Sequence, residues 1–232
     1  MSKILTTLLL TLWLSVGTAW AGDFEDGEAA YAKNDFSTAL TKYKSAAAQG
    51  SSWAQFTLGT MYNNGQGVVQ DYAEAMRWHK LAAAQGNALA QFNLGVMYGN
   101  GQGDVQDYAE AVRWYKLSSA KGLAQAQFNL GFMYNNGQGV VQDYAEAVRW
   151  YKLAAVQGDV SAQIYLGAGY ATGEGVMQDY VRAHMWYNLS AVKNSSAAVF
   201  RDIIAKKMTS QQIAEAQKLA RECQARKFKN CD

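Results

Sequence analysis

The pentapeptide Asp-Tyr-Ala-Glu-Ala at residues 71–75 returns unchanged at residues 107–111 and again at residues 143–147. A weakened copy, Asp-Tyr-Val-Arg-Ala, occupies residues 179–183, and a degenerate one, Asp-Phe-Ser-Thr-Ala, occupies residues 35–39. Successive copies are 36 residues apart. A fixed period of about 20–50 residues indicates a solenoid, in which each repeat buries its apolar face against the next.

The pentapeptide begins the second of two helices that are predicted in each repeat. Asp71 is a favourable N-cap residue, and Glu74 stands at the N3 position of a capping box. Ala75, Trp78 and Ala82 then follow helical spacing on one face. The helix is predicted to end at a residue that tolerates a positive φ, in a column that holds Gly50, Gly86, Gly122, Gly158 and Asn194.

The first helix of the next repeat is predicted to start one residue later, at Asn87. The same N-cap column holds Ser51, Asp159 and Ser195. Leu123 also stands in this column, and its helix should be less well capped because leucine offers no acceptor. A glycine in mid-helix costs about 1 kcal/mol relative to alanine. Its recurrence therefore predicts a close approach between helices, at Gly59, Gly95, Gly131 and Gly167.

The pattern Ala-x3-Leu-Gly-x2-Tyr, then Gly-x-Gly-Val, then Asp-Tyr-x-x-Ala and a Trp, resembles the Sel-one-like repeat (SLR) family, relatives of the tetratricopeptide repeats. The resemblance covers roughly residues 23–208, with four full copies and a partial one in front. It implies an all-α fold, a right-handed α-solenoid of antiparallel helix pairs with a 36-residue repeat and a C-terminal capping helix. It also implies that the first helices line the concave surface.

The chain is predicted to divide into four parts. In chain order these are a signal peptide (1–21), an N-terminal partial repeat (22–50), four Sel-one-like repeats (51–194), and C-terminal capping helices with a tail (195–232). The helix after Met208 has Thr209 as its predicted N-cap and Gln212 at N3, which makes a second capping box.

Residues 1–21 have the composition of a signal peptide. Lys3 supplies positive charge, residues 4–16 form an apolar run, and Ala-Trp-Ala at residues 19–21 matches a small-x-small cleavage site. The run is shorter than the roughly 20 residues that cross a membrane comfortably. We therefore expect cleavage near Ala21 and a periplasmic or secreted protein without a membrane span. An uncleaved anchor is the alternative.

The chain has two cysteines, Cys223 and Cys231. In an exported protein, a disulfide between them is the default interpretation, because exported proteins meet an oxidising environment. Two cysteines without a nearby histidine make only half of a zinc site. We predict neither a metal nor a cofactor.

The charges are nearly balanced, with 21 Lys and Arg against 19 Asp and Glu, so nucleic acid is not an expected partner. Residues 201–232 are mildly basic, which indicates a solvated helix face or, as a weaker alternative, a patch that docks a partner. The terminal helix and tail argue against end-to-end stacking, so we expect a monomer.

Two segments match Ser-x-x-Lys, the start of an acyl-enzyme signature: Ser118 with Lys121, and Ser190 with Lys193. Some bacterial relatives have been linked with penicillin binding or hydrolysis. Both serines stand in a column that otherwise holds alanine, and the accompanying Ser-Asp-Asn and Lys-Thr-Gly motifs are absent. We therefore interpret the serines as packing residues and predict that the protein is not an enzyme.

The histidines and tryptophans also have a scaffold interpretation. His79 stands in a column of tyrosines, and His184 stands in a column of Met and Val. The tryptophans lie on the apolar period, where we expect them to pack between helix pairs, at Trp78, Trp114, Trp150 and Trp186.

The resemblance places the binding residues on the first helices, outside the packing stripe. They are Phe92, Asn93, Val96, Phe128, Asn129, Phe132 and Tyr165. Aromatic side chains supply anchor area, and asparagine amides can hold the backbone of an extended peptide. Asn64, Asn100 and Asn136 stand above the glycine turns, where they either extend this ladder or simply make the turns.

These features predict an exported helical-repeat scaffold that mediates protein–protein interactions, with a peptide or a complex in the cell envelope, through its concave face. Two alternatives remain open. One is a weak β-lactam-binding or β-lactam-hydrolysing enzyme, which rests on family analogy. The other is envelope glycan binding, which the concave aromatic residues permit without selecting it.

Overall fold

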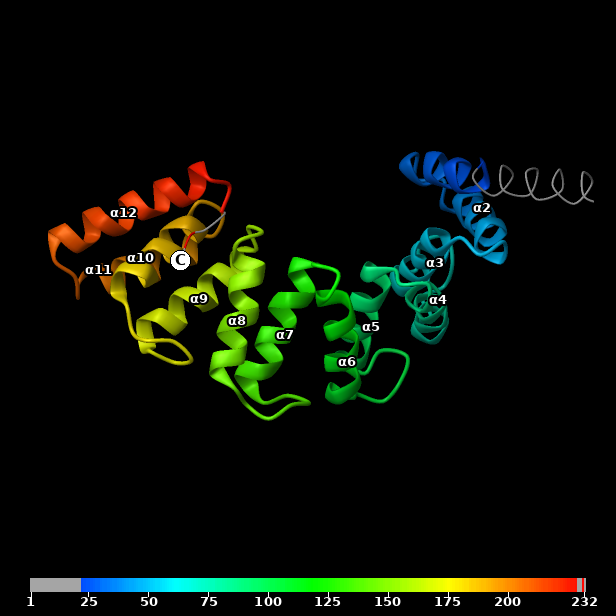
Figure 1. The fold of residues 1–232 in the computed structure, drawn as a ribbon. Helices are drawn as coiled ribbons and strands as arrows, with labels where there is room; N and C mark the ends of the chain where they lie inside the picture. The colour runs from blue at the N-terminus through cyan, green and yellow to red at the C-terminus, as the bar shows by residue number, and fades with distance from the viewer. Residues whose placement is uncertain (1–21, 229–230, 232) are drawn as a thin grey trace, which may run out of the picture. The chain divides into compact units, whose positions relative to one another are not determined.

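The computed structural model describes residues 22–228 and 231, so the predicted signal peptide lies outside the described residues. Every regular element in the described part of the chain is a helix (Figure 1). The predicted all-α class, with helix pairs repeating every 36 residues, is therefore confirmed. The chain forms two compact units, of which the first ends at Asp107 and the second begins at Tyr108.

The first unit begins with a helix over residues 22–32. It continues with α2 (Phe36–Ala48), α3 (Ser52–Asn64), α4 (Tyr72–Ala84) and α5 (Ala88–Asn100). Its core is built from fully buried side chains on α2 and α3, among them Ala39, Tyr43, Leu58 and Met61.

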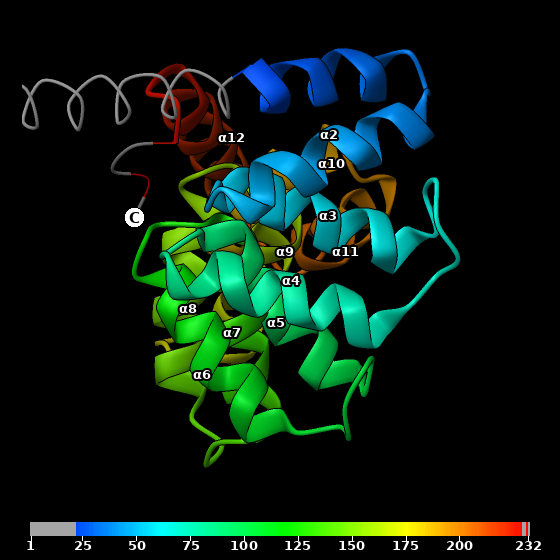
Figure 2. The same cartoon turned by 90° about the vertical axis from the view of Figure 1, so that its right-hand side faces the viewer.

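The second unit contains α6 (Tyr108–Ser119), α7 (Ala124–Asn136), α8 (Tyr144–Ala155), α9 (Val160–Thr172), α10 (Tyr180–Ala191), α11 (Ser195–Ala205) and α12 (Ser210–Ala225). Helices α6, α7 and α8 lie side by side in both views (Figures 1 and 2). The core includes Leu166 from α9, Trp186 from α10 and Ala220 from α12. The last helix is thus part of the same core as the repeats before it.

The helices begin largely where the sequence predicts. Side chains of Ser51, Asn87 and Asp159 cap α3, α5 and α9 by accepting from backbone N–H groups, whereas Leu123 makes no such bond at α7, as predicted. The capping box at the start of α12 is also formed. In α4 the Glu74 carboxylate instead binds the Arg77 guanidinium, so the box predicted there is not closed.

The end of α10 differs from the sequence prediction. The sequence predicts that Asn194 ends this helix with a positive φ and that Ser195 caps the next one. In the structure Asn194 has a φ of −138° and is itself the N-cap of α11, where its side chain accepts from the N–H of Ser196. Asparagine can serve either role, and here the side-chain bond to the next helix is formed.

Replacing Leu123 by Asp should stabilise the protein, because it supplies the missing acceptor at the start of α7. A side-chain N-cap contributes about 1 kcal/mol to helix stability. Urea denaturation followed by circular dichroism would measure the change. Asn87→Leu is the matched control, and it should destabilise by a similar amount. Equal midpoints for Leu123→Asp and the wild type would contradict the prediction.

The mid-helix glycines lie where an aromatic ring of the next helix approaches the backbone. A Cβ added at Gly131 would be 2.8 Å from the Tyr151 ring, and one added at Gly167 would be 2.9 Å from the Tyr187 ring. At Gly59 the neighbouring ring is His79, 2.6 Å from such a Cβ. At these three glycines the predicted close approach is found, between a first helix and the ring of the second helix that follows it.

Gly131→Ala should destabilise the protein by roughly 1–3 kcal/mol, because the methyl group overlaps the Tyr151 ring in a packed interior. The loss should shrink in a Tyr151→Ala background, where the ring is gone. A double-mutant cycle by urea denaturation would measure this coupling. If the two losses simply add, the ring contact is not what keeps this position free of a side chain.

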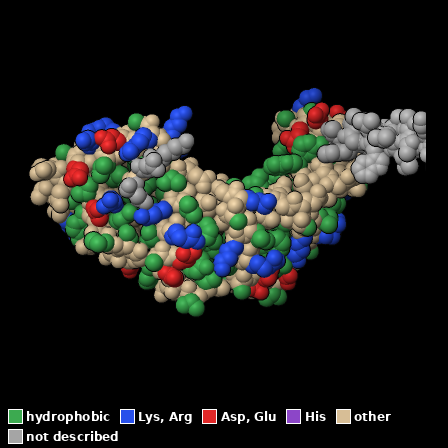
Figure 3. Space-filling view, viewed as in Figure 1, with side chains coloured by type: hydrophobic (Ala, Val, Ile, Leu, Met, Phe, Trp, Pro, Cys, Tyr) green, Lys and Arg blue, Asp and Glu red, His purple; other side chains and the backbone are tan. Residues whose placement is uncertain are grey.

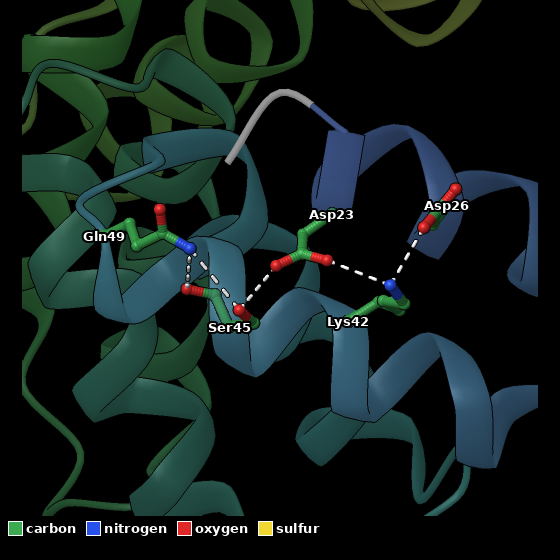
Figure 4. A network of polar contacts seen from close by, with 5 residues as sticks. All are labelled: Asp23, Asp26, Lys42, Ser45 and Gln49. Carbon is green, nitrogen blue, oxygen red and sulfur yellow. Dashed lines mark hydrogen bonds and ion pairs between the residues drawn. The ribbon is translucent and has the colours of Figure 1, made fainter. Parts of the chain in front are cut away.

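Polar contacts hold the first described helix against α2 (Figure 4). The Lys42 ammonium bridges the carboxylates of Asp23, at 3.0 Å, and Asp26, at 2.9 Å. The Ser45 hydroxyl donates to the other Asp23 oxygen at 2.6 Å. These bonds from Ser45 and Lys42 lower the pKa of Asp23. The network links residues 22–32 to α2, within the N-terminal partial repeat.

A disulfide joins Cys223 to Cys231. Cys223 is fully buried on α12, and Phe228 packs against the same core from the intervening turn. Lys227 and Phe228 both have positive φ, at 52° and 64°, which turns the chain back toward the helix. The bond thus fastens the tail to the last helix of the second unit.

Candidate binding site

The seven residues predicted to bind a partner all lie on first helices of their pairs. They are Phe92, Asn93 and Val96 on α5 of the first unit, and Phe128, Asn129, Phe132 and Tyr165 on α7 and α9 of the second. All seven are partly exposed. Each can therefore contact solvent or a ligand while its remaining surface packs in the scaffold.

Four rings of the second unit form what we call the aromatic cluster: Phe128, Phe132, Tyr151 and Tyr165. The Tyr165 ring centroid lies 5.3 Å from that of Tyr151, 5.6 Å from that of Phe128 and 6.0 Å from that of Phe132. The contacts are tilted or edge-on, which are favourable geometries for aromatic rings. The sequence identified three of these rings but not Tyr151, which comes from the second helix α8.

The predicted asparagines are partly engaged by the preceding second helix. The Asn93 amide lies 3.3 Å from Nε2 of His79, and Asn129 is hydrogen-bonded to Tyr115. The same columns hold Tyr151 and Tyr165 one repeat later, where the amide contact is replaced by a ring contact. The scaffold thus holds the side chains of Asn93 and Asn129 in place, and the remaining donors and acceptors of each amide can bind a ligand.

Each unit has a hollow that is lined in part by its candidate binding residues. The first hollow, of about 90 Å³, is lined by Asn63, His79, Asn93, Val96, Met97 and Gln102. The second hollow, of about 150 Å³, is lined by Asn135, Tyr144, Val148, Tyr151, Tyr165, Ala168, Gly169 and Glu174. Every residue of the first hollow has its repeat equivalent in the second, 72 residues later. The two hollows therefore occupy equivalent positions in their repeats.

The floor of each hollow contains a buried polar side chain, His79 in the first and Tyr151 in the second. His79 is 1% exposed, and its Nδ1 has no hydrogen-bond partner among the described residues. Burial lowers the pKa of His79 to about 4, so the ring is neutral at pH 7. Tyr151 is 2% exposed, and its hydroxyl also lacks a partner in the described part of the chain. Burial, with a smaller contribution from Tyr165, raises the pKa of Tyr151.

Sequence reasoning missed the walls of these hollows. It singled out Asn64 and Asn136, which are exposed. The Asn64 amide donates to the Gln66 side chain of the turn at 3.4 Å, whereas the Asn136 amide donates to the Phe132 carbonyl oxygen of its own helix at 2.8 Å. The neighbouring Asn63 and Asn135 line the hollows instead. The available signal was the column comparison: His79 stands in a column of tyrosines, and Glu174 stands in a column that otherwise holds Gln66, Gln102 and Gln138.

The candidate catalytic serines are inaccessible. Ser118 and Ser190 are both 0% exposed, as expected of packing residues. The Ser190 hydroxyl donates to the backbone carbonyls of Trp186 and Tyr187, while Lys193 is exposed. These positions offer a substrate no nucleophile.

The tryptophans divide into two environments. Trp186 is fully buried in the second core. The other three are partly exposed, and each lies under the guanidinium of the residue before it, at 4.2 Å for Trp78 and Trp150 and 4.1 Å for Trp114. The prediction that they pack in the scaffold holds fully for Trp186, whereas the others also support cation–π contacts.

The described part of the chain, residues 22–228 and 231, has no cluster of three or more His, Cys, Asp or Glu side chains placed to hold a metal ion. It also lacks a helix of the length and apolarity needed to cross a bilayer. On the face drawn in Figure 3, Lys and Arg side chains are scattered among acidic and apolar groups and do not gather into one basic field.

The sequence profile described as Sel1 repeat matches residues 54–87, 88–123, 124–159 and 160–194, which together are more than half of the chain. The chain belongs to the Sel1 repeat family. The predicted Sel-one-like resemblance is thereby confirmed. Sel1 repeat proteins are generally protein–protein interaction scaffolds and are typically non-catalytic.

Solved structures of bacterial proteins share the fold. A protective antigen present in uropathogenic Escherichia coli strains, which displays an SLR fold, is 31% identical with a TM-score of 0.79. The match covers 90% of this chain but 45% of the antigen. A Sel1 repeat protein from Oxalobacter formigenes is also 31% identical, with a TM-score of 0.73 and 84% of each chain covered. No curated protein matches the sequence.

The buried His79 ring should make stability depend on pH. The unfolded chain binds a proton at this ring near pH 6.5, whereas the folded chain does so only near pH 4. Stability that is present above pH 6.5 is therefore lost as the pH falls toward 4, by roughly 3 kcal/mol for such a shift.

His79→Tyr restores the residue of the other repeats and should remove this part of the pH dependence. Urea denaturation at pH 7.5 and pH 4.5 would compare the variant with the wild type. His184→Val is the control, because it removes a different buried histidine. An unchanged pH dependence in His79→Tyr would mean that the folded protein accepts a proton at this ring.

Proposed function

We propose that this protein is an exported, monomeric scaffold that binds an extended segment of a partner protein along its first helices. The observation that carries the proposal is the aromatic cluster of α7, α8 and α9, which is partly exposed and borders the second hollow. Rigid aromatic side chains provide much contact area at a low cost in conformational entropy.

The polar groups of the same surface suit a peptide backbone. In the second unit, Asn129 on α7 presents a partly exposed amide side chain, and neither α7 nor α9 carries a charged residue. Amides both donate to carbonyl oxygens and accept from N–H groups. An uncharged surface of amides and rings complements an extended main chain, whose own groups are dipolar rather than charged.

Export is supported by two features. The disulfide between Cys223 and Cys231 is typical of an oxidising compartment. The sequence of residues 1–21 has the three-part pattern of a signal peptide. We place the working protein in the periplasm or outside the cell, with its partner in the cell envelope. We do not propose β-lactam hydrolysis, because Ser118 and Ser190 are buried.

The test is a cross-linked capture from the envelope of the source cells, with residues 22–232 as bait. The variant Phe132→Val/Tyr165→Asn carries the residues found in the same columns at Val96 and Asn129, so its scaffold should be unchanged. We expect it to lose the partner, with affinity reduced about tenfold or more, as is common for aromatic hot-spot residues.

Leu153→Ala is the matched control, since Leu153 is 39% exposed on α8 and lies outside the aromatic cluster. It should capture the partner as the wild type does. Mass spectrometry would identify the captured protein, and titration with its purified form would give both affinities. Equal affinity for the aromatic variant and the wild type would overturn the proposed binding surface.

A further inference from the structure

We propose that the second hollow binds the cationic side chain of a lysine or arginine in the bound segment. This inference rests on the proposed function, because it names one side chain of the peptide that the scaffold would hold. It concerns residues of the second unit alone.

The hollow contains a carboxylate without a cation. Glu174 is exposed at its edge and forms no ion pair with any residue from 22 to 228 or with residue 231. Its described side-chain contact is a hydrogen bond from the Thr172 hydroxyl at 3.2 Å. Helices α7 and α9 carry no charged residue. The negative charge of Glu174 is therefore not neutralised by the helices that form the walls.

The cations of α8, which forms the floor, are engaged elsewhere. The Arg149 guanidinium pairs with the Glu146 carboxylate and lies over the Trp150 ring. The Lys152 ammonium lies over the Tyr170 ring, which lines a different depression. Neither Arg149 nor Lys152 lines the second hollow. A cation from a ligand would thus meet the carboxylate without competing with a resident one.

Aromatic rings provide the second contribution. Tyr144, Tyr151 and Tyr165 all line the second hollow. Ammonium and guanidinium groups are attracted to the faces of such rings, and arginine also stacks on them. The buried Tyr151 hydroxyl lacks a partner among the described residues and can accept an N–H. The volume of about 150 Å³ has room for the end of a Lys or Arg side chain.

The same site in the first unit has different chemistry. The column of Glu174 holds Gln102 in the first hollow, and the column of Tyr165 holds Asn93. The ring at the floor is the neutral His79. The first hollow therefore offers amides without a net charge. Glu174 and Tyr165, the two residues that favour a cation, differ from the residues that stand in the same columns of the preceding repeats.

The residues that the other repeats carry in these columns supply substitutions that should leave the protein folded. Glu174→Gln introduces the residue that the other repeats carry, at Gln66, Gln102 and Gln138. The double variant Glu174→Gln/Gln102→Glu keeps the net charge of the wild type and moves the carboxylate to the first hollow. It separates a local effect of Glu174 from the general attraction between a protein and a cation.

The probe is Nα-acetyl-arginine amide, and Nα-acetyl-citrulline amide is its uncharged isostere. Titration of the ¹⁵N-labelled protein should shift the amide signals of Ala168 and Gly169 in a saturable manner. We expect the citrulline probe to bind about tenfold more weakly, because it loses both the ion pair and the cation–π contact. Glu174→Gln and the charge-matched double variant should each weaken the arginine probe by about fivefold.

Absence of saturable shifts at Ala168 and Gly169, or equal affinity for the two probes, would overturn the inference. So would unchanged affinity in Glu174→Gln. These outcomes leave the proposed function standing if the Phe132→Val/Tyr165→Asn variant still loses the captured partner. Conversely, failure of that variant to weaken capture would count against the peptide surface, even if the arginine probe binds the second hollow.

Discussion

This architecture depends on one kind of contact, in which a side-chain ring of one helix packs against the backbone of a glycine in the neighbouring helix. At Gly59, Gly131 and Gly167 a mid-helix glycine of a first helix leaves space for the ring of the following second helix, as Gly131 does for Tyr151. A glycine weakens a helix by itself, so its benefit has to come from packing. The ring fixes the separation of the two helices, and cap and turn residues then determine where each helix starts.

The same ring connects helix packing to the proposed binding surface. Tyr151 is held by Gly131 on one side and belongs to both the aromatic cluster and the second hollow on the other. In the first unit His79 has the corresponding position: its ring packs against Gly59, contacts Asn93 and lines the first hollow. A residue that cannot move without disturbing the scaffold makes a rigid floor. The more exposed residues around it can then differ between repeats without changing the fold.

The repeat made the fold predictable, because identical residues at a fixed period must adopt the same local structure. The failures fall where a side chain has two possible partners. Glu74 binds Arg77 rather than the helix start, and Asn194 caps α11 rather than ending α10. That the seven candidate binding residues lie on first helices was predictable from the repeat. The hollows were not, because each requires a first helix, a second helix and the next loop to meet.

Most helices pack against the helices next to them in the chain. This arrangement also bears on how such a protein can change over evolutionary time. A duplicated repeat carries its own glycine and ring. Gln102 and Glu174 stand in the same column at the two hollows, so one exchange there changes the charge at the edge of a single hollow. Chains of this kind can therefore acquire a new preference one repeat at a time, while the glycine and ring columns stay constrained together.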